Sequence, residues 1–289
     1  MLMGEHAVVY DHSCLAAAIN KRLSAVVERS EKDYWIDKKF VEKVVLGFRK
    51  VYKLTMPVKI NITSDFSSNY GFGSSSAITV ATAYGLYQFL LNKEPDKKEL
   101  FDFCYQIVLE VQGKASGFDV AAAIYGGIIY FETGGKKIEQ LPTHNFPLVV
   151  GYSGTKANTV SMINLVREKM QSHKTGVNEI FNNIGNLVCE AKTAILEKDL
   201  SRLGVLMNFN QEYLEDLGVS TEKLDDMIIA ARKAGALGAK ISGAGGGDCM
   251  IALTEEGKKE KVKEAIKNAG GEILDIAIEQ EGVRTESDL

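Results

Sequence analysis

Strand-like and helix-like patterns alternate along the first half of the chain. Residues 58–63 alternate apolar and polar side chains, which predicts a half-buried strand. Residues 77–91 form a mostly apolar run that is too long for a strand and predicts a helix. The same patterns predict further strands at 23–28 and 128–131 and further helices at 40–52, 97–112 and 120–125. The apolar residues within 1–10 also indicate a strand that the chain enters part-way.

A proline-bounded segment at 142–147 separates this half from the next and predicts a domain boundary. We therefore expect one domain at 1–145 and a second at 146–289. In the second domain the patterns predict strands at 148–152, 250–253 and 273–278 and helices at 159–170, 177–197, 200–217, 222–235 and 258–268. This succession resembles half of a ferredoxin-like domain, so the predicted fold class is α+β.

The composition argues against several classes of protein. Of the 289 residues 25% are charged and 45% are hydrophobic, which is typical of a soluble globular protein. The net charge of −4 argues against electrostatic binding of nucleic acid. We see no apolar run long enough for a membrane span and no leader pattern at the start. The four cysteines lie far apart, which argues against a zinc site or a disulfide framework and predicts a reducing cytoplasm.

A glycine-rich turn at residues 70–77, Tyr-Gly-Phe-Gly-Ser-Ser-Ser-Ala, lies between the predicted strand and the long helix. A helix start presents unpaired backbone N–H groups and a positive dipole end, which attract phosphate. Glycines let the backbone approach the anion, and a serine hydroxyl can bind Mg²⁺. The alternative is a tight turn with serine as helix cap. The spacing matches neither a Walker loop nor a dinucleotide fingerprint.

Two further segments carry candidate chemistry. Asp119 follows a glycine turn and precedes an apolar run at 120–124. It is either a helix cap or a carboxylate that needs a partner or a catalytic task in a partly buried setting. Residues 243–247 contain four glycines in five positions, which cannot stabilise a helix or strand interior. Such a run allows close approach of the backbone to a ligand or to another loop.

Three motifs in this order resemble the GHMP kinases. They are Gly-Glu-His-Ala-Val-Val-Tyr at 4–10, Gly-Phe-Gly-Ser-Ser-Ser-Ala at 71–77 and Ile-Ser-Gly-Ala-Gly-Gly-Gly at 241–247. Each motif alone is weak, whereas the three together are specific and cover nearly the whole chain. Within the family, the first motif and Glu-Gly-Val-Arg at 281–284 are similar to archaeal-type mevalonate kinases.

The resemblance implies a two-domain fold, with an N-terminal ribosomal-S5-like α/β domain ahead of the ferredoxin-like α+β domain. It implies ATP-dependent phosphorylation of mevalonate to 5-phosphomevalonate, with Mg²⁺ as cofactor. It also implies that mevalonate and ATP are the binding partners, and it leaves a homodimer open. The composition adds the expectation of a cytoplasmic protein without nucleic-acid or membrane partners.

Roles follow for individual residues. The ATP phosphates would be wrapped by Gly71, Phe72, Gly73, Ser74, Ser75 and Ser76. Ser75 would also reach Mg²⁺, and Asp119 would be the catalytic residue that faces the acceptor hydroxyl. The substrate would be lined by Glu5, His6, Gly243, Ala244 and Gly245.

Two features depart from the family pattern. The family carries Pro-Gly-Lys shortly before Gly-Glu-His, and its lysine lies near the catalytic aspartate. Residues 1–3 enter the motif without it, so we expect a truncated start or an impaired enzyme. The family's Mg²⁺-binding glutamate falls at Val108 here. The nearest acid, Glu110, lies about 200° further round an ideal helix and is the candidate second metal ligand.

Two alternatives stay open at this point. Residues 113–121 are also similar to phosphomevalonate kinases, whose phosphorylated acceptor would need extra cations such as Lys114 or Lys156. A binding or regulatory relative without catalysis is the other alternative. The absent lysine and Val108 favour it, whereas Asp119 and the serines oppose it.

Overall fold

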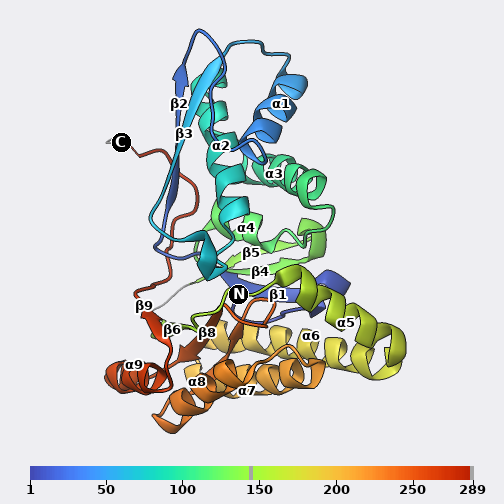
Figure 1. Cartoon of the computed structure of the whole chain (residues 1–289), viewed down its shortest axis with the longest axis vertical. Helices are drawn as coiled ribbons and strands as arrows, with labels where there is room; N and C mark the ends of the chain where they lie inside the picture. Colours follow the sequence, from blue (N-terminus) through green and yellow to red (C-terminus); the bar gives the residue numbers. More distant parts are fainter. Residues whose placement is uncertain (143–145, 287–289) are drawn as a thin grey trace.

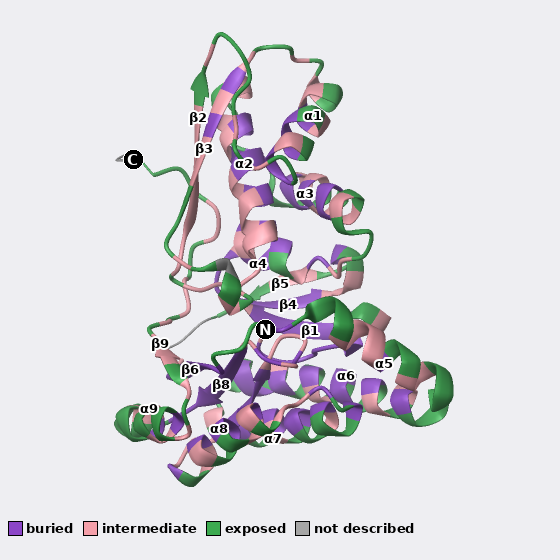
Figure 2. Cartoon of the chain, viewed as in Figure 1, coloured by how far each residue is buried: buried purple, intermediate pink, exposed green. Residues whose placement is uncertain are grey.

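The computed structural model describes residues 1–142 and 146–286. It divides into an upper half, built mainly from the first part of the chain, and a lower half built mainly from the second (Figure 1). The predicted boundary at 142–147 falls partly on residues 143–145, which lie outside the described residues. Buried residues gather where the helices of each half face its sheets (Figure 2).

The N-terminal half pairs two small antiparallel sheets with four helices. One sheet has the order β1-β4-β5, with Leu15 opposite Tyr130, and the other pairs β2 with β3, with Val26 opposite Asn61. Helix α2 packs against β2 and against α1, α3 and α4. The elements in chain order are η1 (Ala7–Tyr10), β1 (Ser13–Ala17), β2 (Leu23–Arg29), α1 (Val41–Tyr52), β3 (Val58–Ser64), η2 (Ser68–Tyr70), α2 (Ser74–Leu91), α3 (Lys97–Gln112), α4 (Phe118–Tyr125), β4 (Ile128–Glu132), η3 (Thr133–Gly135) and β5 (Ile138–Leu141).

The C-terminal half is one antiparallel sheet with helices packed against it. The strand order is β7-β8-β6-β9, and Val150 of β6 lies opposite Ile251 of β8. The α+β fold class predicted from the sequence is therefore confirmed. The elements are β6 (Leu148–Tyr152), α5 (Thr159–Ser172), α6 (Lys174–Glu197), α7 (Leu200–Leu217), α8 (Glu222–Lys233), β7 (Gly238–Ser242), β8 (Cys249–Leu253), η4 (Glu256–Lys258), α9 (Lys259–Asn268) and β9 (Glu272–Leu274).

Local sequence signals explain where several helices begin and end. Asp96 accepts hydrogen bonds from two backbone N–H groups in the first turn of α3, and Gly113 ends that helix at φ 76°. Thr221 caps α8 by accepting from the N–H of Leu224. These helices agree with the predicted ranges because their apolar faces repeat with the helical period.

The opening of the chain differs from the strand that its apolar residues suggest. Ala7–Tyr10 forms a 3₁₀-helix, because Gly4 and His6 turn the backbone with φ values of 101° and 59°. This short helix belongs to the core of the C-terminal half: Ala7 is fully buried there, and the Tyr10 ring stacks on Phe181 of α6 with 4.5 Å between centroids.

The last part of the chain runs from the C-terminal half back to the N-terminal half (Figure 1). Instead of the predicted strand at 273–278, β9 ends at Leu274, and residues 275–284 run back along the N-terminal half (Figure 1). We call residues 275–284 the C-terminal strap. The N–H of Glu279 donates to the carbonyl oxygen of Ala18 at 3.0 Å, and the N–H of Gly127 donates to that of Glu279 at 2.7 Å. The strap therefore ties the two halves together. No helix within the described residues is long and apolar enough to cross a membrane.

Candidate active site

The N-termini of α2 and α4 meet at the centre of the molecule. Each helix starts behind a glycine with positive φ, Gly73 at 71° and Gly117 at 94°, and no side chain caps either start. In α3, by contrast, Asp96 occupies the first N–H groups. The backbone donors of α2 and α4 are thus left for another acceptor, as at anion-binding helix starts.

Asp119 lies in the first turn of α4 and packs directly on the backbone of Gly73. A Cβ built on Gly73 would come within 3.2 Å of the Asp119 carboxyl carbon, so the glycine loop and the carboxylate are in close contact. The helix cap of α4 is Gly117, not Asp119, which removes the capping explanation for this acid. The structure thus brings together two of the predicted site residues from segments far apart in sequence.

Asp119 is exposed to solvent, yet many protein atoms lie around its carboxyl group. Both descriptions fit a group that faces a cavity, where its tip meets solvent while the neighbouring protein reduces hydration. This loss of hydration raises the pKa of Asp119 to about 6. A carboxylate with such a pKa can act as a base near neutral pH.

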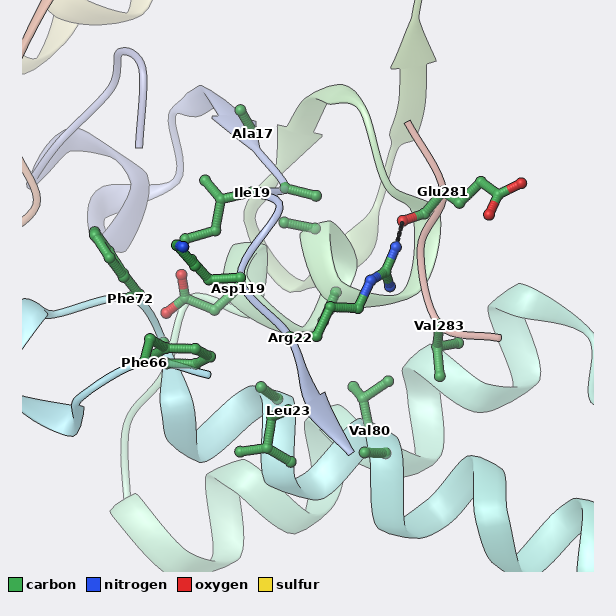
Figure 3. A pocket seen from close by; sticks show the side chains of 17 residues that line it. Ala17, Ile19, Arg22, Leu23, Phe66, Phe72, Val80, Asp119, Glu281 and Val283 are labelled. Carbon is green, nitrogen blue, oxygen red and sulfur yellow. Dashed lines mark hydrogen bonds between the residues drawn. The ribbon is translucent and has the colours of Figure 1, made fainter. Parts of the chain in front are cut away.

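A cavity of about 140 Å³ opens beside Asp119. Figure 3 shows Asp119 close to Phe72 and Phe66, while Arg22 turns away toward the backbone of Glu281. The wall comes from the glycine loop, α2, α4, the β1–β2 connection and the C-terminal strap. Its lining is largely apolar, as is usual for small-molecule sites, and consists of Ala17, Ala18, Ile19, Lys21, Arg22, Leu23, Phe66, Phe72, Gly73, Ala77, Val80, Ala81, Asp119, Ala122, Ala123, Glu281 and Val283.

The three serines of the loop have different surroundings. Ser74 and Ser75 are half-buried, whereas the side chain of Ser76 is buried. Ser75 accepts a hydrogen bond from Gln112 at 3.1 Å. Ser74 and Ser75 can therefore offer hydroxyls to a ligand, while Ser76 can offer its backbone N–H.

Glu110 does not join this group. It is exposed and accepts a hydrogen bond from Gln106 at 3.2 Å. Gln112 reaches Ser75, and a residue two positions earlier lies about 200° away on an ideal helix. The α3 side chain beside the serine loop is thus a neutral amide and not the expected second carboxylate.

Glu5 also lies elsewhere than expected. Its carboxylate is buried and accepts a hydrogen bond from the fully buried Lys240 of β7. It does not line the Asp119 cavity. Removing one partner of a buried ion pair leaves an uncompensated charge and costs about 3–5 kcal/mol. We therefore assign the pair a structural role, which anchors the Gly-Glu-His turn to the C-terminal half.

His6 is anchored in the same way. Its Nε2 lies 2.8 Å from the carbonyl oxygen of Ala244, and burial lowers the pKa of the imidazole. The neutral ring therefore donates to Ala244 and holds two predicted substrate-site segments together. Neither His6 nor the run Gly243, Ala244, Gly245 lines the Asp119 cavity.

The second glycine-rich segment contacts the first through Asp248. One oxygen of Asp248 accepts from the N–H of Ala157 at 2.9 Å, and the other would lie 2.5 Å from a Cβ on Gly71. Burial raises the pKa of this carboxyl group. A side chain at Gly71 would therefore overlap the Asp248 carboxylate, whereas one at Gly73 would press on the Asp119 carboxylate less severely.

Sequence reasoning missed three residues near the site. Gln112 could have been found as the last residue of the predicted helix before Asp119. Asp248 ends the second glycine run at φ 54°, a signal of a special backbone position. Lys21 lies on the connection between β1 and β2, and nothing in its local sequence points to a site.

The donors present fit a metal that is held mainly by a phosphate ligand. Within the described residues no cluster of three or more His, Cys, Asp or Glu side chains could hold a metal. Mg²⁺ at nucleotide sites keeps water ligands and binds substrate phosphates together with few protein oxygens. The Ser75 hydroxyl is such an oxygen at an open helix start.

The chain is similar to known proteins along nearly its whole length. The models of the GHMP kinases N-terminal and C-terminal domains match residues 39–127 and 191–272. The mevalonate kinase of Pyrococcus furiosus is 36% identical over 323 residues, covering 99% of this chain and 96% of that protein. The mevalonate kinase of Thermococcus sibiricus is 37% identical over 322 residues, with coverage of 99% and 96%. The crystal structure of the Methanococcus jannaschii mevalonate kinase superposes with a TM-score of 0.80 at 26% identity, covering 96% of this chain and 95% of that one.

Proposed function

The chain belongs to the GHMP kinase family, and we propose that it transfers the γ-phosphate of ATP to the 5-hydroxyl of mevalonate. Full-length similarity to archaeal mevalonate kinases supports this acceptor. One structural observation carries the chemical part of the proposal. A carboxylate with a pKa of about 6 faces a cavity directly beside the uncapped start of α2.

The reaction follows from the roles of these groups. The N–H groups at the start of α2 hold the transferring phosphate, and the Ser74 and Ser75 hydroxyls add donors. Asp119 accepts the proton of the acceptor hydroxyl or orients that hydroxyl for in-line attack. A bond forms between the hydroxyl oxygen and the γ-phosphorus as the bond to the bridging oxygen of ADP breaks. ADP leaves with that oxygen and its electron pair.

Mg²⁺ is the proposed cofactor. When bound, it neutralises charge on the β- and γ-phosphates. In this chain the Ser75 hydroxyl would hold it, and Gln112 would orient that hydroxyl through the hydrogen bond of 3.1 Å. A cytoplasmic location and a homodimer stay predictions.

The test is an ADP-release assay with mevalonate and phosphomevalonate side by side. We expect ATP-dependent turnover with mevalonate and little with phosphomevalonate. Faster turnover of phosphomevalonate would show that the protein is a phosphomevalonate kinase. Absence of turnover with either acceptor, in a protein that still binds Mg·ATP, would leave a binding relative of the family.

A further inference from the structure

Within the part of the chain that the structure describes, four charged side chains line the Asp119 cavity, and two of them are neutralised by other protein groups. Arg22 forms an ion pair with Glu279 at 3.2 Å and donates to the carbonyls of Glu281 and Gly282 at 3.2 and 3.0 Å. The carboxylate of Glu281 pairs with Arg284 at 2.8 Å. These groups hold the C-terminal strap against the cavity and have little charge left for a ligand.

The other two charges are Asp119 and Lys21. Lys21 is half-buried and makes no ion pair or hydrogen bond with any residue of the described ranges 1–142 and 146–286. It also lines a neighbouring cavity of about 220 Å³, which shares Phe66 and Phe72 with the first. A half-buried ammonium group without a partner favours an anion from the ligand.

We infer that Lys21 binds the carboxylate of the acceptor and selects a singly charged hydroxy acid. This inference rests on the proposed function. Among the described residues, the cavity lining offers one carboxylate without an ion-pair partner, Asp119, and one unpaired cation, Lys21, together with apolar side chains. Mevalonate carries a hydroxyl, a carboxylate and a methyl-bearing carbon between them. A neutral sugar would leave Lys21 unpaired, and a phosphorylated acceptor would bring more negative charge than one lysine neutralises.

The test combines variants that change the charge at residue 21 with substrates that differ in charge. Lys21→Met removes the charge and keeps side-chain length, and Lys21→Arg restores a cation. The exposed Lys267 on α9 supplies the matched control, Lys267→Met. Each protein is assayed with mevalonate and with mevalonamide, its uncharged amide, and KM for Mg·ATP is measured in parallel. Melting temperatures show whether each variant folds.

For Lys21→Met we expect the KM for mevalonate to rise about 10- to 100-fold, the usual range for loss of a charge-assisted hydrogen bond. The KM for mevalonamide should change little, Lys21→Arg should recover part of the affinity, and Lys267→Met should resemble the wild type. Equal effects on mevalonate and mevalonamide would overturn the inference. So would a rise confined to the KM for Mg·ATP, because Lys21 would then serve a nucleotide phosphate.

The same experiment distinguishes failure of the proposed function from failure of the proposed role of Lys21. Wild-type protein that does not turn over mevalonate would contradict the proposed function, and the inference with it. Wild-type turnover of mevalonate together with an unchanged Lys21→Met would contradict the role of Lys21 alone.

Discussion

The two glycine-rich segments of this chain have similar composition but opposite surroundings. In the first, Gly71 and Gly73 face the side chains of two acids, Asp248 and Asp119. In the second, a Cβ on Gly245 would lie 2.2 Å from the carbonyl oxygen of Val219, and one on Gly247 would lie 2.6 Å from that of Thr155. At Gly245 and Gly247 the second segment therefore packs against the backbone of other loops.

This difference assigns different tasks to the two segments. The first ends in an uncapped helix start beside a cavity, so its glycines expose donors and bring Asp119 close. The second fixes loops of the C-terminal half to one another, with the N–H of Gly246 donating to the carbonyl oxygen of Val219 at 2.8 Å. Glycine content alone did not distinguish the binding loop from the packing loop.

The largest effect is expected at the acid that the first segment contacts. Asp119→Asn should lower kcat by about 10²- to 10⁴-fold, the range for a positioned general base. Because folding raises the pKa of Asp119, its ionised form at pH 8 opposes folding, so the neutral amide should leave Tm unchanged or higher. Unchanged kcat with unchanged Tm would refute the catalytic role.

Next is the hydroxyl at the start of α2. Ser75→Ala should lose roughly 2–4 kcal/mol of transition-state stabilisation and change the Mg²⁺ dependence of turnover, because one electrostatic contact is removed. Kinetics over a series of Mg²⁺ concentrations measure both effects. Ser242→Ala, at the edge of the second segment, is the matched control. If the turnover of Ser75→Ala depends on Mg²⁺ concentration as that of the wild type does, Ser75 does not bind the metal and has a structural role.

A pair of glycine variants tests the comparison itself. Gly245→Ala, at φ 79° and against a backbone carbonyl, should lower stability by about 1–3 kcal/mol. Gly73→Ala also has positive φ, but its new methyl group meets the movable Asp119 side chain at 3.2 Å. We expect a smaller loss of stability and a larger loss of kcat. Urea unfolding measures the loss of stability, and steady-state kinetics measure the loss of kcat. The same ratio of kcat loss to stability loss in both variants would contradict the proposed difference between the two segments.

The smallest predicted effect concerns pH. The Asp119 carboxylate must be ionised to accept a proton, and its pKa is raised to about 6. We expect kcat/KM to fall about tenfold per unit of pH below 6, rather than only below the usual aspartate range. A profile that stays flat down to pH 4.5 would show that Asp119 does not control turnover.

Local patterns were sufficient to predict most of the fold. The helices α3 and α7 were predicted with their observed bounds, because each combines a helical apolar period with a terminal glycine. The 3₁₀-helix Ala7–Tyr10 was missed because its β-branched residues suggest a strand, while the turn at Gly4 and His6 depends on packing against the other half.

The site could be predicted only where its chemistry is local. The glycine loop and Asp119 each have a sequence signal, so both were proposed from the sequence. The burial of Glu5 depends on Lys240, which lies 235 residues away inside a buried strand. Likewise, the role of Lys21 follows from the pairing of Arg22 with the strap, which no local pattern indicates.

The most direct test of the central claim is ³¹P NMR of a mixture of the protein, Mg·ATP and mevalonate. The account predicts that ADP accumulates with a phosphomonoester whose phosphorus couples to the protons of the adjacent CH₂ group, as transfer to the primary hydroxyl requires. ADP with inorganic phosphate alone, or an ester without that coupling, would contradict it.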